Sequence, residues 1–440
     1  MIAACTYLLA LLYCFVWLRI PEAVGLVLPF QRLVAWAGLG AFVVLLTTGR
    51  PLRVGRSARL FLRFTVLFVA MLIVNLFAQA TGERRMYALY FLMDFSKYLA
   101  IFSAAFVTYY ALRRGLVDEN GYVRCVMLSG VASLVVLCLL VALYYLGFRT
   151  DIDFLAHSFG GVLGVWPIPG SLPRLAGTTA EPQQLSVVYL TPLMLMLSPE
   201  HLRRYKWFAL LGVVVLILSQ SKFAVVSLLL IYLFVLATYP RARMALIAAG
   251  ILLAPVAGAV LIRLPTFSAL LTEGVGAGAF VERLQNLFLL LSIARDHLLF
   301  GIGAGQYGVY RGEVLFGDPL FNPGYTPNMD FLKVLAEVGL VGFLVVTAML
   351  VGLLYSFIRS RSLLPPQLRP RFLAFLLGAV GILLNMLVGY ELLHVFFWLN
   401  VGFLLYLCET AREGGPDVEV ARVSERGGVG DPVGAVGLAD

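Results

Sequence analysis

The sequence predicts an all-α protein that crosses a membrane many times. Of its 440 residues, 61% are hydrophobic and only 13% are charged, whereas a soluble domain is usually about 45–50% apolar and roughly 25% charged. Apolar runs long enough to cross a hydrocarbon core of ~30 Å recur from end to end. They are too long and too continuous for barrel strands, so they favour a polytopic membrane protein with helical spans.

Twelve predicted spans account for the hydropathy of the chain. The first, over 2–18, has no basic segment before it and no clear small-x-small cleavage site, so we interpret it as a retained helix. The others are predicted at 30–48, 60–79, 88–111, 123–147, 183–198, 206–221, 223–239, 244–262, 330–357, 372–388 and 391–409. They form an integral membrane domain over 1–412. Residues 413–440, rich in Gly, Val, Asp and Glu, are expected to form a disordered cytoplasmic tail.

Basic residues gather in alternate connections between these spans. The connection after the second span carries Arg50, Arg53, Arg56, Arg59 and Arg63, and smaller groups follow the fourth, sixth, eighth, tenth and last spans. The positive-inside rule places these connections, and both termini, in the cytoplasm. The net charge of +9 is therefore a topology signal and does not indicate a nucleic-acid-binding surface.

The opposite face of the membrane carries two long connections, over about 149–182 and 263–328. The second is far longer than a bundle linker requires. Within it, residues 280–300 combine apolar positions at helical spacing with interspersed charges, which predicts a helix along the membrane surface or over a cavity. The Gly-rich run 301–305 follows no strand of a βαβ unit, so we expect a sharp turn and not a dinucleotide site.

Several cations lie outside the cytoplasmic connections. Lys97, inside the fourth span, is expected to pair with Asp94 one helical turn earlier. Three others belong to the extracytoplasmic side: Arg174, Lys222 and Arg283. Three cations converging there would suit a pyrophosphate, because Lys and Arg both stabilise charge on a phosphate leaving group. For each one alone, an anchor to lipid headgroups or a salt bridge remains an alternative.

Arg174 begins a segment that ends in Glu181 and Pro182. A carboxylate followed by proline is a favourable helix start, because proline is tolerated in the first turn and the positive helix end favours an anion. Two functional interpretations stand beside this one. Glu181 would orient Arg174, or it would act as a general base for an incoming hydroxyl.

The sequence lacks the motifs of several other classes of enzyme and transporter. The five cysteines have no metal-ligand spacing, and the loop histidines His157 and His297 have no partners at such spacing. The chain contains no HExxH, GxSxG, P-loop or CxxC pattern. The sequence therefore argues against zinc proteolysis, serine hydrolysis and ATP-driven transport by this chain.

Four features in this order resemble bacterial O-antigen polymerases. The segment 174–182 resembles their RxxGxxxEP signature, and Ser221–Lys222 resembles a following Ser-Arg pair, with Lys in place of Arg. Arg283 and the segment 296–307 resemble the core of the family's large loop. The segment 328–342 resembles the chain that leaves this loop and enters the next span.

The superfamily that the chain resembles contains O-antigen polymerases and O-antigen ligases. The resemblance implies a GT-C-like glycosyltransferase that needs no metal or cofactor and acts at the periplasmic face of the bacterial inner membrane. Its donor would be a glycan on undecaprenyl pyrophosphate. Arg174, Lys222 and Arg283 would hold the pyrophosphate, and the substrate-binding residues would also include His297, Tyr307 and Asn328.

One departure from the family pattern distinguishes a polymerase from a ligase. Ligases typically carry a His just before the Asn at the end of the large loop, proposed to activate the acceptor hydroxyl, and Pro327 stands at that position here. This favours a polymerase and leaves the base unassigned, with Glu181 and Asp330 as candidates.

The predicted function is therefore an O-antigen or exopolysaccharide polymerase, with a chain-length regulator and a flippase as implied partners. The near alternative is a ligase that moves the glycan onto lipid A-core. A polysaccharide flippase or transporter is more distant, because the charges gather in two loops and the Asp-Arg-x-Gly-Arg-Arg pattern of major-facilitator transporters is missing.

Overall fold

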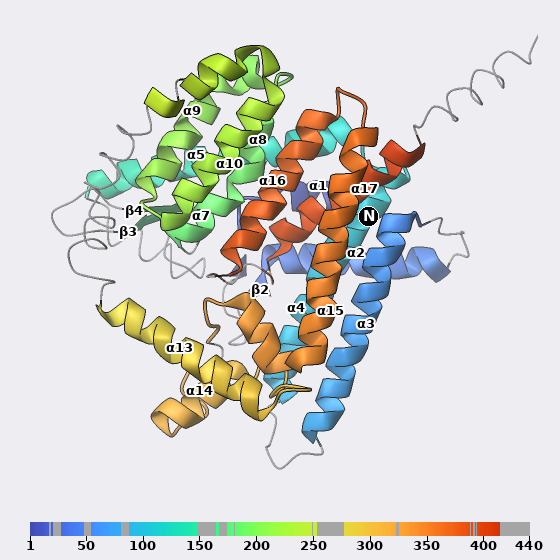
Figure 1. Cartoon of the computed structure of the whole chain (residues 1–440), viewed down its shortest axis with the longest axis vertical. Coiled ribbons are helices and arrows are strands. Elements are labelled where there is room, and N and C mark those ends of the chain that lie inside the picture. Colours follow the sequence, from blue (N-terminus) through green and yellow to red (C-terminus); the bar gives the residue numbers. More distant parts are fainter. Residues whose placement is uncertain are drawn as a thin grey trace, which may run out of the picture.

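The protein is almost entirely helical, as the composition predicts (Figure 1). The computed structural model describes residues 1–16, 19–20, 28–47, 54–80, 88–147, 164–166, 174–179, 181–248, 250–252, 277–322, 325–387, 389, 392 and 394–413. The two short sheets within these ranges each contain two strands. The predicted tail lies outside the described residues except for Glu413, as do parts of both predicted long connections.

The elements follow one another in a simple order. They are α1 (Ile2–Leu11), β1 (Arg19–Ile20), β2 (Leu28–Pro29), α2 (Phe30–Thr47), α3 (Arg56–Ala80), α4 (Ala88–Arg113), α5 (Glu119–Tyr145), β3 (Gly164–Trp166), β4 (Arg174–Gly177), α7 (Pro182–Val188), α8 (Leu190–Met196), α9 (Leu202–Leu218), α10 (Lys222–Thr238), η1 (Pro240–Ala242), α13 (Ala277–Asp296), α14 (Tyr307–Phe316), α15 (Asp330–Ser360), η2 (Arg361–Leu363), α16 (Arg369–Asn385) and α17 (Val395–Glu413). The helix predicted over 280–300 is α13.

Several of these helices can cross a membrane. By length and composition, four qualify among the described residues: Arg56–Phe77, Tyr90–Arg113, Glu119–Tyr145 and Asp330–Leu363. A fifth is added if the bent pair Lys222–Thr238 and Pro240–Leu252 forms one span. The chain is thus a multi-pass membrane protein, and the count of twelve spans stays a prediction.

The predicted span over 2–18 is helical only as far as Leu11. Beyond it, side chains from distant segments bind the irregular backbone around Cys14. Its N–H donates to Ser129 Oγ (2.8 Å), and its carbonyl accepts from Thr178 Oγ1 (2.6 Å). These bonds replace the helical ones that the sequence pattern predicted.

The predicted span over 183–198 is divided into α7 and α8 at Tyr189. Pro192 lies in the first turn of α8 and has no N–H to offer the carbonyl four residues earlier, so a continuous helix would lose a bond there. The Tyr189 hydroxyl donates to Ser133 Oγ on α5, which fixes the break against the neighbouring helix.

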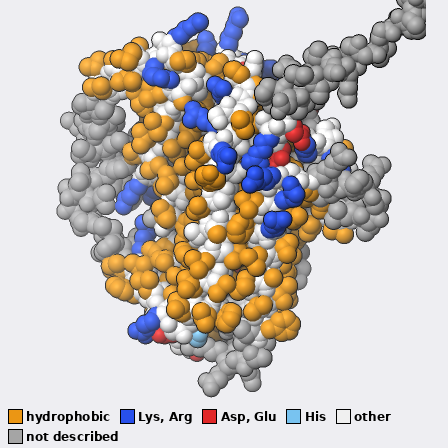
Figure 2. All heavy atoms as spheres, turned by 45° about the vertical axis from the view of Figure 1, so that its right-hand side comes forward, with side chains coloured by type: hydrophobic (Ala, Val, Ile, Leu, Met, Phe, Trp, Pro, Cys, Tyr) orange, Lys and Arg blue, Asp and Glu red, His pale blue; other side chains and the backbone are white. Residues whose placement is uncertain are grey.

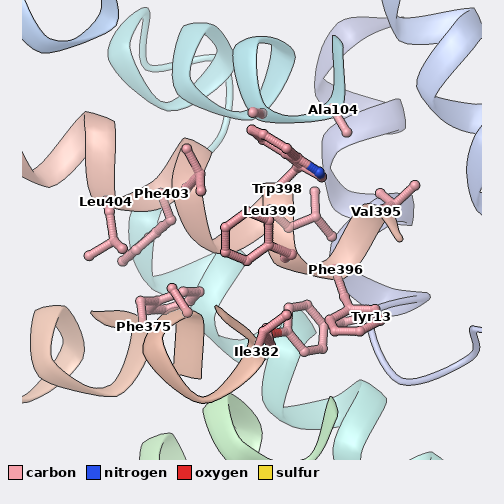
Figure 3. Close-up of a cluster of buried hydrophobic side chains, with 14 of the residues drawn as sticks. Tyr13, Ala104, Phe375, Ile382, Val395, Phe396, Trp398, Leu399, Phe403 and Leu404 are labelled. Atoms are coloured by element: carbon pink, nitrogen blue, oxygen red, sulfur yellow. The ribbon is translucent and has the colours of Figure 1, made fainter. Parts of the chain in front are cut away.

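The hydrophobic core between the long helices surrounds α17, which packs against α4, α16, α15 and α3. Figure 3 shows its aromatic side chains, with Trp398 between the helices and Phe403 above Phe375. The Phe375 and Phe403 rings stack with centroids 4.1 Å apart. Tyr13 reaches this core from α1's end, where its hydroxyl donates to Asn400 Oδ1 (2.9 Å).

The large loop forms a smaller body, in which α13 and α14 pack on the first half of α15. The predicted sharp turn is present, because Gly301, Gly303 and Gly305 all have positive φ. A Cβ on Gly301 would lie 2.4 Å from the carbonyl carbon of Glu337. This close approach is possible because Gly339, at φ 75°, interrupts the helical backbone of α15.

Candidate functional site

Arg174 lies at the start of β4, half-buried beside the junction of α9 and α10. Its Nε donates to the carbonyl oxygen of Ser219 (3.4 Å). Burial lowers the pKa of the Arg174 guanidinium, and the charge of Glu181 opposes that shift. The orienting role of Glu181 toward Arg174 stays a prediction.

The backbone conformation at residue 177 requires glycine. Gly177 has φ +61°, and a Cβ there would meet Leu185 Cδ1 at 2.9 Å. The next residue, Thr178, has its Oγ1 2.5 Å from Ser133 Oγ on α5. This hydrogen bond holds the turn after β4 against α5, and it fixes the backbone from which the Arg174 side chain extends.

Glu181 stands at the N-cap of α7, and Pro182 is the first residue of the helix. The predicted helix start is confirmed. The Glu181 side chain, however, accepts no capping hydrogen bond from the α7 backbone. Both functional interpretations of Glu181, orienting Arg174 and acting as a base, stay predictions.

Lys222 is the first residue of α10 and its side chain is exposed. The preceding Ser221 caps the helix, with its Oγ accepting from the Phe223 N–H (3.2 Å). Gln220 has a left-handed φ of 48°, an unfavourable conformation for a residue with a side chain. The junction therefore turns sharply and places Lys222 three residues after the Ser219 carbonyl that Arg174 binds.

Arg283 lies on α13, away from β4 and α10 (Figure 1). Its neighbour Glu282 faces into the loop, where its carboxylate pairs with Arg311 (3.7 Å) and accepts from the Tyr325 hydroxyl (2.9 Å). Arg283, one residue later on the helix, is exposed. The structure thus places Arg174 against Ser219, three residues before Lys222 in the chain, and leaves Arg283 on the separate helix α13.

The three loop residues predicted to bind substrate differ in their surroundings. Tyr307 is fully buried; its hydroxyl donates to Asn286 Oδ1 (2.9 Å) and its N–H to Glu337 Oε1 (3.1 Å). It contributes to the core of the loop. His297 and Asn328 are half-buried, the first just after α13 and the second just before α15.

Asp330 opens α15 and is buried. Its Oδ2 accepts from the Leu392 N–H (2.7 Å), and its own N–H donates to the Gly389 carbonyl (3.1 Å). Asp330 therefore joins the start of α15 to the connection between α16 and α17. One of its carboxylate oxygens is therefore engaged in joining these two segments.

His394, which the sequence analysis passed over, lies at this same connection. Its Nε2 is 3.1 Å from the Gln184 side-chain nitrogen in the first turn of α7, and Gln183 Nε2 donates to Asn385 Oδ1 (2.6 Å). The available signal was an ionisable side chain inside the predicted span 391–409, which is a functional candidate by default. The α7 start thus meets both ends of the α16–α17 connection.

These contacts bring four segments together: 174–184, the α9–α10 junction, the α16–α17 connection and the start of α15. Within the described ranges, no group of three or more His, Cys, Asp or Glu is arranged to hold a metal ion. The charge available to an anion at this site comes from Arg174 and Lys222.

The comparison with protein families covers part of the chain that forms this site. Residues 207–347, from α9 into α15, match the family model described as O-Antigen ligase. The matched segment contains Lys222, Arg283 and Asp330, and the segment 174–182 precedes it. No curated protein matches the chain significantly. The family match over this part of the chain supports the resemblance of this multi-pass membrane protein to the O-antigen ligase and polymerase superfamily.

Proposed function

We propose that this protein is a polysaccharide polymerase of the bacterial inner membrane. It transfers a growing glycan from undecaprenyl pyrophosphate onto the non-reducing sugar of a new lipid-linked repeat unit at the periplasmic face. The observation that carries the proposal is the contact of half-buried Arg174 with the Ser219 carbonyl, three residues before the exposed Lys222. Two cations there suit a pyrophosphate group.

In the reaction, an acceptor hydroxyl oxygen bonds to sugar C1 while the bond from C1 to the pyrophosphate oxygen breaks. The electron pair leaves with undecaprenyl pyrophosphate. Arg174 offers a planar fork of donors and Lys222 a point charge, and both stabilise the negative charge that develops on the leaving group. The low dielectric around half-buried Arg174 strengthens this effect.

The acceptor hydroxyl must lose a proton, and His394 is the base that we assign. One oxygen of Asp330 is engaged by the Leu392 N–H, and Glu181 lies at the N-cap of α7. His394 contacts Gln184 through one ring nitrogen. In the neutral imidazole one of the two ring nitrogens carries a lone pair, and that nitrogen takes the proton.

Arg283 completes the site when the large loop closes over the bound donor. It is exposed on α13, in a loop body that packs against α15. Loops of this kind close over substrate and exclude water. The closed loop also shapes the groove for the acceptor sugar.

The experiment replaces Arg283 by Ala and supplies the purified protein in liposomes with lipid-linked repeat. We expect polymer formation to be abolished while the protein inserts normally, because the variant loses leaving-group stabilisation and no buried contact. Arg295→Ala is the matched control: it lies on the same helix, is exposed and pairs only with Asp296. A full ladder of chain lengths from Arg283→Ala would contradict the role assigned to Arg283.

A ligase is the second candidate, because the matched family model is described as O-Antigen ligase. The two activities differ in their acceptor. Lipid-linked repeat alone is lengthened by a polymerase, whereas a ligase forms product only when lipid A-core is added. Pro327, at the position of the ligase histidine, supports the polymerase.

A further inference from the structure

A second group of cations lies at the far end of α15 from the large loop, and the proposed function does not use it. There a cavity of about 690 Å³ opens between α3, the end of α15 and the end of α17. Five arginines line it: Arg56, Arg59, Arg63, Arg359 and Arg412. We call it the basic cavity. In Figure 2, which brings the α3 side forward, Lys and Arg side chains gather on the upper part of the visible face.

Most of the charge in the basic cavity has no counter-charge. Arg412 donates to Ser57 Oγ (2.9 Å) and Ser356 Oγ (3.3 Å) and lies 3.8 Å from Glu409. The other four arginines are exposed, and none forms an ion pair with a carboxylate within the described part of the chain. Like charges around one cavity repel each other, and a bound anion would offset that repulsion.

The wall below the arginines is apolar. On α3, Arg56, Arg59 and Arg63 follow one helical face, and Leu60 lies among them. Gly352 on α15 leaves the opposite wall open, since a Cβ there would come no closer than 3.5 Å to Leu60 Cδ2. A cationic rim over an apolar wall matches an amphiphile better than it matches a free ion.

The outer surface of α3 supports the same conclusion. Only 22% of its most apolar window is buried within the protein. Leu62, Val66 and Leu67 are exposed just beyond the basic cavity, with 38%, 60% and 47% of their surfaces accessible. Acyl chains can therefore lie along α3 while a headgroup occupies the cavity.

We propose that the basic cavity binds the phosphate headgroup of an anionic phospholipid, whose acyl chains lie along the exposed face of α3. Basic pockets between membrane helices bind such headgroups through the charge of Lys and Arg. The bound lipid would join α3 to α15 and α17 at the end opposite the large loop. The site is independent of the proposed polymerase function.

The test uses the purified full chain and measures bound lipid by native mass spectrometry. Phosphatidylglycerol and phosphatidylcholine are titrated against wild type and Arg59→Gln/Arg63→Gln. We expect wild type to prefer phosphatidylglycerol, and the double variant to bind it about fivefold more weakly for each arginine removed. Arg203→Gln/Arg204→Gln is the matched control, because these arginines are exposed on α9 and do not line the cavity. Its binding should equal wild type.

Thermal unfolding checks that each variant is folded, and the single Arg63→Gln replaces the double variant if that one is not. The proposal is overturned if the cavity variant retains wild-type binding, or if the control loses as much as the cavity variant. It is also overturned if inorganic phosphate displaces phosphatidylglycerol at equal concentration, since a free anion would then be the ligand.

Discussion

The charged residues near the two ends of α15 differ in burial and in pairing. Near its start, Lys333 is buried, with its Nζ 3.0 Å from Asp94 Oδ2 and 3.5 Å from Glu337 Oε2. Lys97 binds the other oxygen of Asp94, as predicted. Near its end, the arginines of the basic cavity are exposed and mostly without carboxylate partners. Paired, buried charges hold elements together, whereas unpaired, exposed ones remain free to bind a ligand.

The paired cluster also connects the membrane body to the large loop. Glu337 Oε1 accepts the N–H of Tyr307 (3.1 Å), and the Glu337 carbonyl accepts the N–H of Gly303 (2.9 Å). Since Lys333 lies between Glu337 and Asp94 on α4, one buried cation links α4, α15 and the loop. The following predictions test whether the two ends differ in this sense.

The largest effect is expected from Lys333→Met. Removing this cation leaves Asp94 and Glu337 buried with less compensation, which costs about 3–5 kcal/mol of unfolding free energy. Thermal unfolding in detergent measures the loss. The double variant Asp94→Asn/Lys333→Met should recover part of it. Unchanged stability of Lys333→Met would mean that the cluster is not structural.

A smaller effect is expected from Gly339→Ala, which acts on the backbone beside the cluster. Gly339 has φ 75° and ψ −178°, and a Cβ would lie 2.2 Å from the Leu299 carbonyl oxygen. That conformation alone costs a residue with a side chain about 1–3 kcal/mol. We expect faster proteolysis of the loop between α13 and α15.

Gly352→Ala provides the control on the same helix. Its Cβ would meet Leu60 Cδ2 at an ordinary 3.5 Å, so its cleavage rate should match wild type. Equal rates for Gly339→Ala and Gly352→Ala would show that the backbone at Gly339 does not hold the loop.

The smallest effect is expected from Arg59→Gln at the other end of α15. Because this exposed arginine has no carboxylate partner in the described residues, its loss should change stability by less than about 0.5 kcal/mol without lipid. With phosphatidylglycerol, the variant should gain less in melting temperature than wild type. A loss above about 1 kcal/mol without lipid would place Arg59 among the structural charges.

Much of the helical framework was predictable because hydropathy is local. The predicted spans 30–48, 88–111 and 123–147 correspond closely to α2, α4 and α5. The spans 2–18 and 183–198 were wrong in continuity, since distant side chains bind the backbone at Cys14 and a proline interrupts the helix near Tyr189. Of these two causes, only the proline was visible in the sequence.

The candidate site was predictable only where its residues are close to each other in the chain. Arg174 and Glu181 are close in the chain, and their mutual influence could be inferred from spacing. His394 was missed because its partner Gln184 is 210 residues away, so no local pattern connects them. The contact of Arg174 with the Ser219 carbonyl likewise depended on how β4 meets the α9–α10 junction.

The membrane class, most helices, the Gly-rich turn and the resemblance to a family could be predicted, because they follow from composition, periodicity and short motifs. Which charges are paired could not be predicted, because pairing depends on how the helices pack. Asp94 and Lys333 are 239 residues apart, and Arg59 and Arg359 line one cavity although they belong to different helices. Charge pairing depends on distance in space and on burial, and packing between helices sets both.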